Sequence, residues 1–391
     1  MLLNRRNAKY GVFVFLALLF AAILIYLAFA GYKLWKWNAY WFPSYLQQQV
    51  STSTHPDEIE HLMFVVADHY EPGFEKEAAI KANEAWLNDY QQAVAGKQDS
   101  YGNRFVYNWF YPFDQRNDEV LQRLQVEVER GAGEIEFHWH KPCLTAEEYQ
   151  TQLTEAVSWF QQWGAFKAFN ATSPRFAFIA GNWDLDNGRG TGCGIDNEIT
   201  QLREAGGYMD MTYSTLGSPA QPRKMINQLY YVNDTLTAKS YEQGRRVKVG
   251  SPAPADPFLM FQGPLSFHWD LEFEYGALET YALPSLKRIQ RWLDSHIHVA
   301  GKPEWSFVKL YSHGIQSPEI VQLHLGPMLD QLKAETERRN IKLHYVSARE
   351  AYNIVRAAEA GEQGDPEQYR DYLYASPITS PIASPVAPGT D

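Results

Sequence analysis

Histidine and acidic residues gather where two apolar runs of the sequence end. The run "HLMFVVA" is followed by Asp68, His69 and Glu71, and the run "GEIEFHWH" closes on His138 and His140. Side chains two residues apart on a β-strand point to the same face, so the imidazoles of "HWH" can hold one divalent metal ion, at roughly 2.0–2.1 Å each for zinc. A third ligand from Asp68 or His69 would leave an open position for a water molecule, whose pKa the metal lowers.

Other apolar runs also end on polar residues. The segment "EWSFVKLYSHG" ends on His313, and further runs end on or next to Tyr111, Asp114, Asn182, Trp183, Asp184 and Asp210. Single residues of this kind have ordinary explanations too. Asp68 can cap a helix or turn, His69 can be a hydrogen-bonded core histidine, and His313 can belong to a turn. Their shared position at predicted strand ends favours one common site.

The elements that must position these residues alternate along the chain. Strands are predicted at residues 62–67, 104–113, 133–140, 175–181, 208–214, 304–314 and 341–348, and helices at 75–96, 118–131, 145–163, 193–207, 281–301, 317–340 and 349–361. This order predicts one parallel sheet with crossover helices, closed or nearly closed into a barrel, with an open doubly wound sheet as the alternative. In both architectures ligands bind at the carboxyl ends of the strands.

A membrane segment precedes this α/β unit. Gly11–Ala30 is an uncharged apolar run, long enough to cross a hydrocarbon layer of roughly 30 Å as a helix. Basic residues and then an aromatic belt flank it, which favours a cytoplasmic N-terminus. A cleaved secretory signal is the alternative, because Ala28-Phe29-Ala30 resembles a signal peptidase site. Both alternatives send the main domain to the same side of the membrane.

Composition divides the rest of the chain. The expected parts are a cytoplasmic N-terminus (1–10), a transmembrane anchor (11–31), a juxtamembrane stalk (32–57), a catalytic domain (58–370) and a disordered Pro/Ser-rich tail (371–391). The net charge of -11 argues against nucleic acid as a partner. The two cysteines, Cys143 and Cys193, can pair in an oxidising compartment or stay as two buried thiols in a reducing one.

Several segments together resemble a bacterial group of polysaccharide deacetylase-like proteins, related to the NodB-type carbohydrate esterases. These segments are "FVVADHYEP", "EIEFHWHKP", "FIAGNWDLDNG", "CGIDNEITQL", "YMDMTYS", "QPRKMINQLYY" and "EWSFVKLYSHG". The resemblance covers most of residues 60–355. It implies a distorted (β/α)7 barrel, a divalent metal held by one Asp and two His, and hydrolysis of an acetyl group on a glycan.

Carrying the motifs across residue by residue gives a partial match. The first motif normally ends on two acids, a base and a metal ligand, and here the pair is Asp68-His69. Either Asp68 is the ligand, or His69 takes that role. The second motif spaces its histidines four apart, whereas here His138 and His140 are two apart. The last motif, a strand that ends on a histidine acting as general acid, matches through His313.

The sequence therefore predicts a membrane-anchored carbohydrate hydrolase, a deacetylase of a surface or exported polysaccharide. The expected metal ion is zinc, with Asp68, His138 and His140 as its ligands. The expected catalytic residues are Asp68, His69 and His313. The expected sugar contacts are Tyr111, Asn182, Trp183 and Asp184. The expected location is the bacterial inner membrane, single-pass, with the main domain periplasmic or extracellular. Two other functions stay open: an inactive glycan-binding barrel in an export complex, and a glycosidase using carboxylates such as Asp68 and Asp184.

Overall fold

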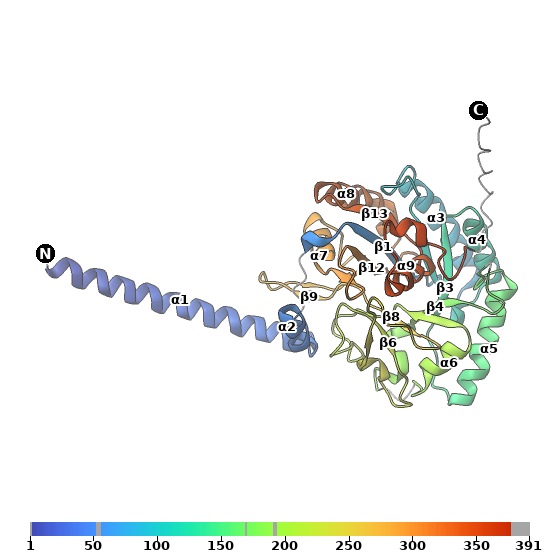
Figure 1. Ribbon diagram of the computed structural model, residues 1–391, viewed down its shortest axis with the longest axis horizontal. Helices are drawn as coiled ribbons and strands as arrows, with labels where there is room; N and C mark the ends of the chain where they lie inside the picture. Colours follow the sequence, from blue (N-terminus) through green and yellow to red (C-terminus); the bar gives the residue numbers. More distant parts are fainter. Residues whose placement is uncertain (1, 52–55, 169, 191–193, 377–391) are drawn as a thin grey trace.

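The structure is a computed structural model that describes residues 2–51, 56–168, 170–190 and 194–376. A long N-terminal helix projects from a rounded α/β body (Figure 1). Of the two cysteines, Cys143 is disulfide-bonded. Cys193 and residues 377–391 of the predicted tail lie outside the described residues.

An eleven-stranded mixed sheet forms the centre of the body. Its strand order is β11-β12-β1-β2-β3-β4-β5-β8-β6-β7, with β13 also paired to β1. The strands are β1 (His61–His69), β2 (Tyr107–Pro112), β3 (Gly133–Trp139), β4 (Phe176–Ala180), β5 (Gly207–Asp210), β6 (Leu229–Val232), β7 (Gly244–Arg246), β8 (Leu259–Phe261), β11 (Ile297–His298), β12 (Trp305–Ser312) and β13 (Lys342–Tyr345). All neighbours from β12 through β8 pair in parallel, whereas β6, β7 and β11 pair antiparallel.

The predicted parallel α/β sheet is therefore confirmed, but a closed barrel is not. Within the described ranges no strand ladder joins β8 to β12. The sheet nevertheless curls, because side chains bridge that interval. The Phe261 and Phe307 rings lie 5.6 Å apart, and the Lys309 amine donates to the Met211 carbonyl oxygen at 2.8 Å. Side-chain packing, together with an isolated parallel bridge between Lys248, just after β7, and Ala300, just after β11, brings the two sides of the curl together without a continuous ladder.

Helices cover the outer face of the sheet. They are α3 (Lys76–Ala93), α4 (Asp118–Glu129), α5 (Ala146–Gln162), α6 (Glu198–Glu204), α7 (Leu286–Asp294) and α8 (Gly326–Arg338). Their apolar stripes pack with one face of the strands into the larger hydrophobic cluster. The inner face packs into a second cluster together with α9 (Ala348–Ala360). The predicted capping box at Thr145 is confirmed, since its side chain accepts from the Glu148 amide and the Glu148 side chain accepts from the Thr145 amide.

Two predicted elements differ from the structure. The helix expected over residues 281–301 is confined to α7, and residues 297–298 form β11 instead. The irregular stretch before residue 263 contains β6, β7 and β8, whose short apolar pieces lack a clear period. It is followed by a two-stranded hairpin, β9 (Ser266–Phe267) and β10 (Phe273–Glu274).

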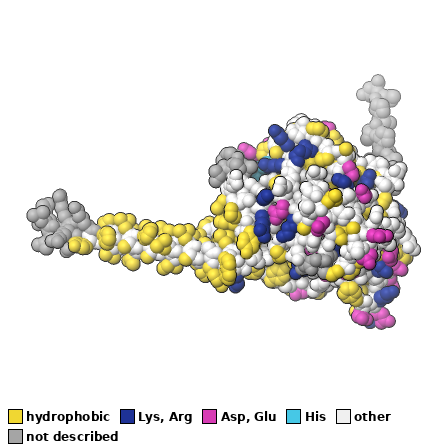
Figure 2. Space-filling view, turned by 90° about the horizontal axis from the view of Figure 1, so that it is seen from below, with side chains coloured by type: hydrophobic (Ala, Val, Ile, Leu, Met, Phe, Trp, Pro, Cys, Tyr) yellow, Lys and Arg dark blue, Asp and Glu magenta, His cyan; other side chains and the backbone are white. Residues whose placement is uncertain are grey.

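The predicted apolar N-terminal helix is confirmed as α1 (Leu2–Lys36). Most of its residues Tyr10–Lys36 are exposed and none is buried, and this stretch is long and apolar enough to cross a membrane. Figure 2 shows hydrophobic side chains covering this helix and continuing onto the adjoining surface of the body.

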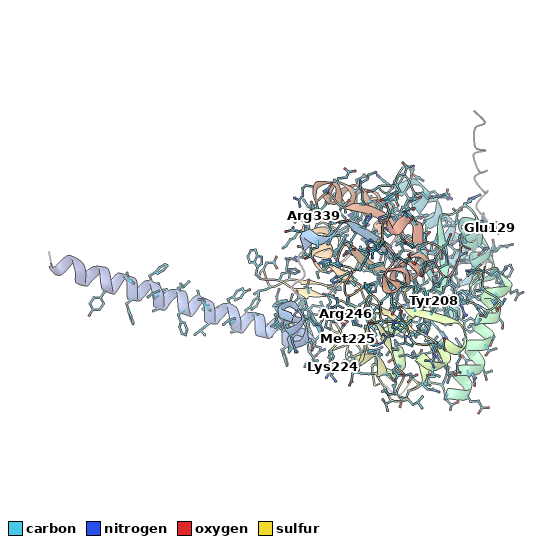
Figure 3. The ribbon with its side chains drawn as sticks, in the orientation of Figure 1. Glu129, Tyr208, Lys224, Met225, Arg246 and Arg339 are labelled. Atoms are coloured by element: carbon cyan, nitrogen blue, oxygen red, sulfur yellow. The ribbon has the colours of Figure 1, made fainter. Side chains whose placement is uncertain are left out.

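The segment predicted as a stalk is folded against the body where the structure describes it. The helix α2 (Phe42–Ser51) begins beside Trp41, which is only 1% exposed and packs in a third cluster with Ile226 and Leu265. Gln48 donates to the Lys224 carbonyl oxygen at 2.8 Å, and Lys224 and Met225 lie on the side of the body near α2 (Figure 3). Aromatic burial thus ties the helix to the domain instead of leaving a free spacer.

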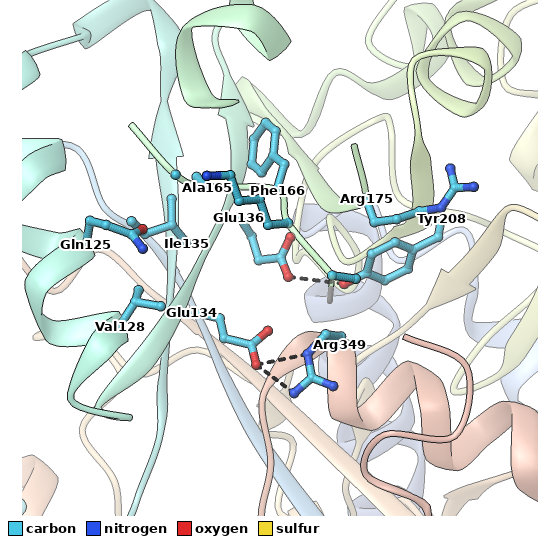
Figure 4. A pocket seen from close by; sticks show the side chains of 13 residues that line it. Gln125, Val128, Glu134, Ile135, Glu136, Ala165, Phe166, Arg175, Tyr208 and Arg349 are labelled. Carbon is cyan, nitrogen blue, oxygen red and sulfur yellow. Dashed lines mark hydrogen bonds and ion pairs between the residues drawn. The ribbon is translucent and has the colours of Figure 1, made fainter. Parts of the chain in front are cut away.

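The first residues of the predicted tail also pack on the body. The Asp371 carboxylate accepts from Arg349 at 2.6 Å, and the Tyr374 ring stacks on Tyr352 at 5.7 Å. Arg349 also binds Glu134, at the amino end of β3, where these side chains line a small cavity of about 30 Å³ (Figure 4). The folded domain therefore continues to at least residue 376, beyond the predicted boundary at 370.

Candidate metal and catalytic site

Four histidines meet on the inner face of the sheet, at the carboxyl ends of its parallel strands. Strand residues alternate between faces. On β1, Ala67 belongs to the inner cluster, so His69 faces inward; on β3, Trp139 faces outward, so His138 and His140 face inward. His313 follows the end of β12. The ring centroids lie 4.5 Å apart for His138–His140, 4.8 Å for His69–His138 and 4.6 Å for His69–His313. The predicted histidines therefore form one cluster.

Glu71 lies at the centre of this cluster. Its Oε1 is 3.2 Å from the Nε2 of His138, 3.3 Å from that of His140 and 3.6 Å from that of His313. The second oxygen, Oε2, accepts from the Gln316 side-chain amide at 2.7 Å. Three imidazole nitrogens from two strands thus converge on one carboxylate oxygen.

The other nitrogen of each of these three rings is held by an acceptor. The Nδ1 of His138 lies 2.8 Å from the Ile179 carbonyl oxygen, that of His140 lies 3.2 Å from the Asp114 carboxylate, and that of His313 lies 2.7 Å from Glu279. A carbonyl or carboxylate oxygen only accepts, so each Nδ1 carries the hydrogen and donates it. This arrangement orients the rings, as carboxylates and carbonyls do behind metal-bound histidines.

A positive charge is needed where the three Nε2 atoms meet Glu71. When Nδ1 carries the only hydrogen of a neutral imidazole, Nε2 presents a lone pair, and Glu71 presents lone pairs as well. Lone pairs facing each other at 3.2–3.6 Å repel unless a proton or a cation lies between them. Either protonated imidazoles or a bound metal ion would satisfy the cluster, and the inward donor set of imidazole and carboxylate suits a divalent transition metal such as zinc.

The Nε2 atom of His69 is a further possible metal ligand, and it has no hydrogen-bond partner among the described residues. The residue is 3% exposed. One ligand atom each from His69, Glu71 and His138 lies within 4.8 Å of the other two. A buried, unpartnered imidazole nitrogen is costly in a metal-free site, and coordination would remove that cost. The residues present therefore fit a metal ion.

The protonation preferences of the cluster follow from burial and hydrogen bonding. Burial alone would raise the pKa of Glu71, but hydrogen bonds to His138 and His140 outweigh it and hold that pKa below its ordinary value. Burial would lower the pKa of His140, yet Asp114 and Glu71 raise it to about 9. Burial lowers the pKa of His138 and of His69 below the ordinary histidine value. The acid thus stays ionised beside a protonated His140, while burial holds His69 neutral.

A glycine permits the close packing behind His140. Gly181 directly follows β4, and a Cβ atom at this position would lie 2.5 Å from the His140 Cδ2 and 2.6 Å from the Trp139 carbonyl oxygen. Contacts this short are not tolerated, so a larger residue would push His140 away from Glu71. The motif "FIAGNW" therefore contributes to the site through the space that its glycine leaves.

The structure corrects the prediction that Asp68 is a metal ligand beside His138 and His140. Asp68 follows Ala67 and so turns to the outer face, where its Oδ1 accepts from the Gly314 amide at 2.6 Å. The carboxylate that contacts the two imidazoles belongs to Glu71. Burial raises the pKa of Asp68 to about 7.

The structure also corrects the prediction that Tyr111 contacts sugar. Tyr111 is fully buried on the outer face, where its ring packs against Trp159 and Phe160, and its hydroxyl donates to the Gln115 carbonyl oxygen at 3.2 Å. The alternation of β2 explains this position. A residue inside the hydrophobic core cannot touch a substrate without opening that core.

The remaining predicted sugar contacts lie close together after β4. The Trp183 ring is 6.5 Å from His69 and 6.3 Å from Tyr311, which brings it to the edge of the cluster. Asn182 is exposed, whereas Asp184 is 8% exposed and accepts from the Arg189 amide at 2.7 Å. Trp183 is thus placed beside the histidines, and Asp184 is engaged in shaping its own loop.

Sequence reasoning missed two acids that complete the cluster. Glu71 belonged to the group of polar residues after the first apolar run but was given no role, although one residue separates it from His69 just as one separates His138 from His140. Glu279 lies in a loop without any periodic pattern and is 3% exposed. Only the folded chain brings Glu279 to His313, because β12 and this loop meet at the Ala277–Tyr311 bridge.

Comparison with solved structures shows distant likeness in fold. No family model matches the chain, and no curated protein matches it. The chain is similar to a crystal structure from Parabacteroides distasonis, provisionally described as a glycoside hydrolase/deacetylase, with a TM-score of 0.39 and 8% identity over 76% of this chain and 71% of that one. The contacts between the histidines and Glu71, and not this likeness, are the basis for the site.

Proposed function

We propose that this chain is a membrane-anchored, extracytoplasmic, metal-dependent carbohydrate hydrolase, a deacetylase acting on a surface or exported glycan. The observation that carries the proposal is the convergence of three anchored imidazoles on Glu71, beside the unpartnered Nε2 of His69. The resemblance of the strand-end motifs to polysaccharide deacetylases supports the choice of reaction, and the curled sheet is compatible with their distorted (β/α)7 barrel.

The proposed metal ligands are His69, Glu71 and His138, with His140 as a fourth. A divalent ion at this position would activate a water molecule and polarise an acyl oxygen. His138 and His69 are almost fully buried, whereas the side chains of His140 and His313 are 23% and 21% exposed. Substrate would therefore approach from the side of His140 and His313.

His313 is the proposed general acid. Burial would lower its pKa, but the hydrogen bond to Glu279 outweighs it and raises the pKa above the ordinary histidine value. The Nδ1–H of His313 remains hydrogen-bonded to the Glu279 carboxylate. The Nε2 of His313 is therefore the atom that gives a proton to the leaving nitrogen or oxygen of the sugar. Trp183 beside His69 offers a flat ring on which a sugar face can stack.

The extracytoplasmic placement has two supports. The exposed apolar helix α1 is long enough to anchor the chain, and Cys143 is disulfide-bonded, as in proteins of oxidising compartments. The proposal also places the N-terminus in the cytoplasm and the body outside the membrane. Protease added to intact spheroplasts should therefore digest the body.

Metal analysis tests the proposed function. Full-length protein in detergent should bind one equivalent of zinc after chelation and reloading, and it should release acetate from N- or O-acetylated oligosaccharides only when loaded. His138→Asn should lose the metal and the activity. His298→Asn is the matched control, because His298 is also buried in the sheet, but its Nδ1 bonds to the His296 carbonyl oxygen away from the cluster.

Other outcomes would change the assignment. Equal metal content in both variants removes the site, and acetate release that survives chelation removes metal dependence. If His138→Asn fails to fold, Glu71→Gln in the partly exposed loop after β1 serves in its place. Sugar binding without metal and without acetate release would favour a binding protein, and new reducing ends without acetate would favour a glycosidase.

A further inference from the structure

The β9–β10 hairpin reaches along the N-terminal helix. Its connecting residues 268–272 project from the body beside α1 (Figure 1). The Tyr26 hydroxyl donates to the Trp269 carbonyl oxygen at 2.5 Å, and the Lys33 amine donates to the Leu271 carbonyl oxygen at 2.8 Å. Both contacts join the hairpin to residues of α1 that lie more than 230 positions earlier in the chain.

The contact with Tyr26 sets the level of the hairpin relative to the apolar run. Tyr26 lies four residues before Ala30, the last residue of that run, which corresponds to about 6 Å along a helix. Lys33 lies beyond the run, at the level expected for lipid headgroups. If α1 spans a bilayer, the hairpin tip therefore lies within the interfacial layer of about 5–10 Å in which amphipathic segments bury apolar side chains.

The chemistry of the tip suits that layer. Trp269 is 84% exposed, and tryptophan is enriched at the membrane interface, where its ring is buried and its N–H stays near water. Backbone carbonyls at this depth need hydrogen-bond donors, because hydrocarbon offers none. Tyr26 and Lys33 supply those donors to the tip.

The acidic residues of the hairpin are neutralised from α7. The Asp270 carboxylate pairs with Arg291 and, at 2.6 Å, with Lys287, and Lys287 also reaches Glu272 at 2.6 Å. These pairs lower the cost of bringing two carboxylates close to a bilayer surface.

Aromatic packing fixes the hairpin to the membrane-proximal residues. Phe273 lies 6.3 Å from Trp41 and 4.7 Å from Phe267, and Phe267 lies 5.6 Å from Phe42, measured between ring centroids. Trp41 itself is 1% exposed. The hairpin, the end of α1 and the start of α2 therefore form one rigid unit.

We propose that the hairpin tip is a second membrane contact, in which Trp269 inserts into the lipid interface beside α1. The inference rests on the part of the proposed function that makes α1 a membrane anchor. The chain that leaves β10 leads directly to Glu279, which holds His313. The contact therefore fixes the height of the catalytic rim above the bilayer and favours a glycan that is held at the membrane surface.

Spin-label accessibility in the full-length protein, reconstituted in phosphatidylcholine/phosphatidylglycerol vesicles, tests this contact. Three variants each receive one nitroxide, namely Trp269→Cys, Ile25→Cys on the apolar run and Leu236→Cys. Ile25 is 71% exposed and Leu236 is 65% exposed, so both controls match the openness of position 269. Oxygen partitions into lipid and a nickel chelate stays in water, so the ratio of the two accessibilities reports depth.

We expect the ratio at position 269 to lie several-fold above that at position 236 and near that at position 25. A ratio at 269 equal to that at 236, with 25 in lipid, overturns the hairpin contact and leaves the anchor intact. An aqueous ratio at 25 overturns the anchor and this inference together, while the metal site keeps its own test. Wild-type protein carried through the same labelling gives the background from the native cysteines.

Discussion

The two ends of the inner face of β3 bury similar polar groups and satisfy them in opposite ways. At the amino end, Glu134 accepts two hydrogen bonds from Arg349 at 3.1 and 3.0 Å, while Glu136 accepts from the Tyr208 hydroxyl at 3.1 Å and the Ala177 amide at 2.6 Å (Figure 4). At the carboxyl end, the Nε2 atoms of His138 and His140 converge on the Glu71 carboxylate, and only a proton or a metal ion between them satisfies both sides.

The difference separates a structural network from a functional one. Each acid at the amino end has a donor within reach, so that end is complete as the chain folds. The carboxyl end contains donors of electron pairs without enough acceptors, and it includes the unpartnered Nε2 of His69. Buried acids alone therefore say little about function, whereas imidazole nitrogens that converge with a carboxylate on one point form a donor set that suits a divalent cation.

Removing the cation of the amino end should give the largest effect on stability. Arg349 is 5% exposed, so Arg349→Met leaves Glu134 buried without its partner, and we expect the free energy of unfolding to fall by about 3–5 kcal/mol. Urea denaturation of the full-length protein in detergent measures it. Adding Glu134→Gln to this variant should recover part of the loss. A loss that the second substitution leaves unchanged would show that contacts of Arg349 with residues 370–374 dominate.

Uncoupling His313 should reduce catalysis without removing the metal. Glu279→Gln replaces the carboxylate on Nδ1, so the pKa of His313 should fall, and we expect kcat to drop roughly 10–100-fold, with its alkaline limit moved to lower pH. Acetate release measured between pH 5 and 10 checks both effects. Glu136→Gln is the matched control, because burial raises the pKa of Glu136 and the neutral amide resembles its protonated form. Equal losses in both variants would contradict the assignment.

The carboxyl end should also control how the metal-free protein responds to pH. The pKa of His140 is raised to about 9 in the folded chain from 6.5, so its stabilising contribution is present below about pH 6.5 and is lost as the pH rises through 9. We expect a loss of roughly 1–3 kcal/mol between pH 6.5 and 10. Urea midpoints of chelated wild type against chelated His140→Asn measure it, and the variant should lack this slope. Parallel slopes would contradict the assignment to His140.

The smallest effects should come from Tyr111, which the sequence placed in the site and the structure places in the core. Tyr111→Phe loses the hydrogen bond to Gln115 and should cost about 0.5–1.5 kcal/mol of stability, with KM unchanged. Trp183→Ala, beside His69, should instead raise KM with little effect on stability. A rise in KM for Tyr111→Phe would return that residue to the site.

Local patterns predicted much of the fold because single elements depend on nearby residues. The capping box at Thr145, the strand ends at His69 and His138, and the apolar helix could all be read from short stretches. The alternation of side chains along β1 also contained the correction to Asp68, since adjacent residues cannot share a face. The histidine cluster was therefore predictable from the sequence. The same alternation could also have predicted Glu71 as the carboxylate of the cluster.

Long-range placement accounts for what the sequence did not show. Glu279 and the hairpin lie in loops without a period, and their partners His313 and Tyr26 are far away in the chain. The curl of the sheet without a ladder between β8 and β12 is likewise a result of long-range contacts, such as the packing of Phe261 on Phe307 and the backbone bridge between Lys248 and Ala300. Such contacts depend on the whole fold, and no short motif encodes them.

The tie between Arg349, Asn353 and the last described residues bears on how a truncated protein should be designed for expression. Asn353 donates to the carbonyl oxygens of Arg370 and Tyr374 at 2.6 and 2.8 Å, and its own oxygen accepts from the Tyr374 amide at 3.0 Å. A stop codon after residue 370 would remove Tyr374 from Asn353 and Asp371 from Arg349, and would expose the base of the domain. A recombinant version that ends after residue 376 keeps the contacts of Arg349 and Asn353 with Asp371 and Tyr374.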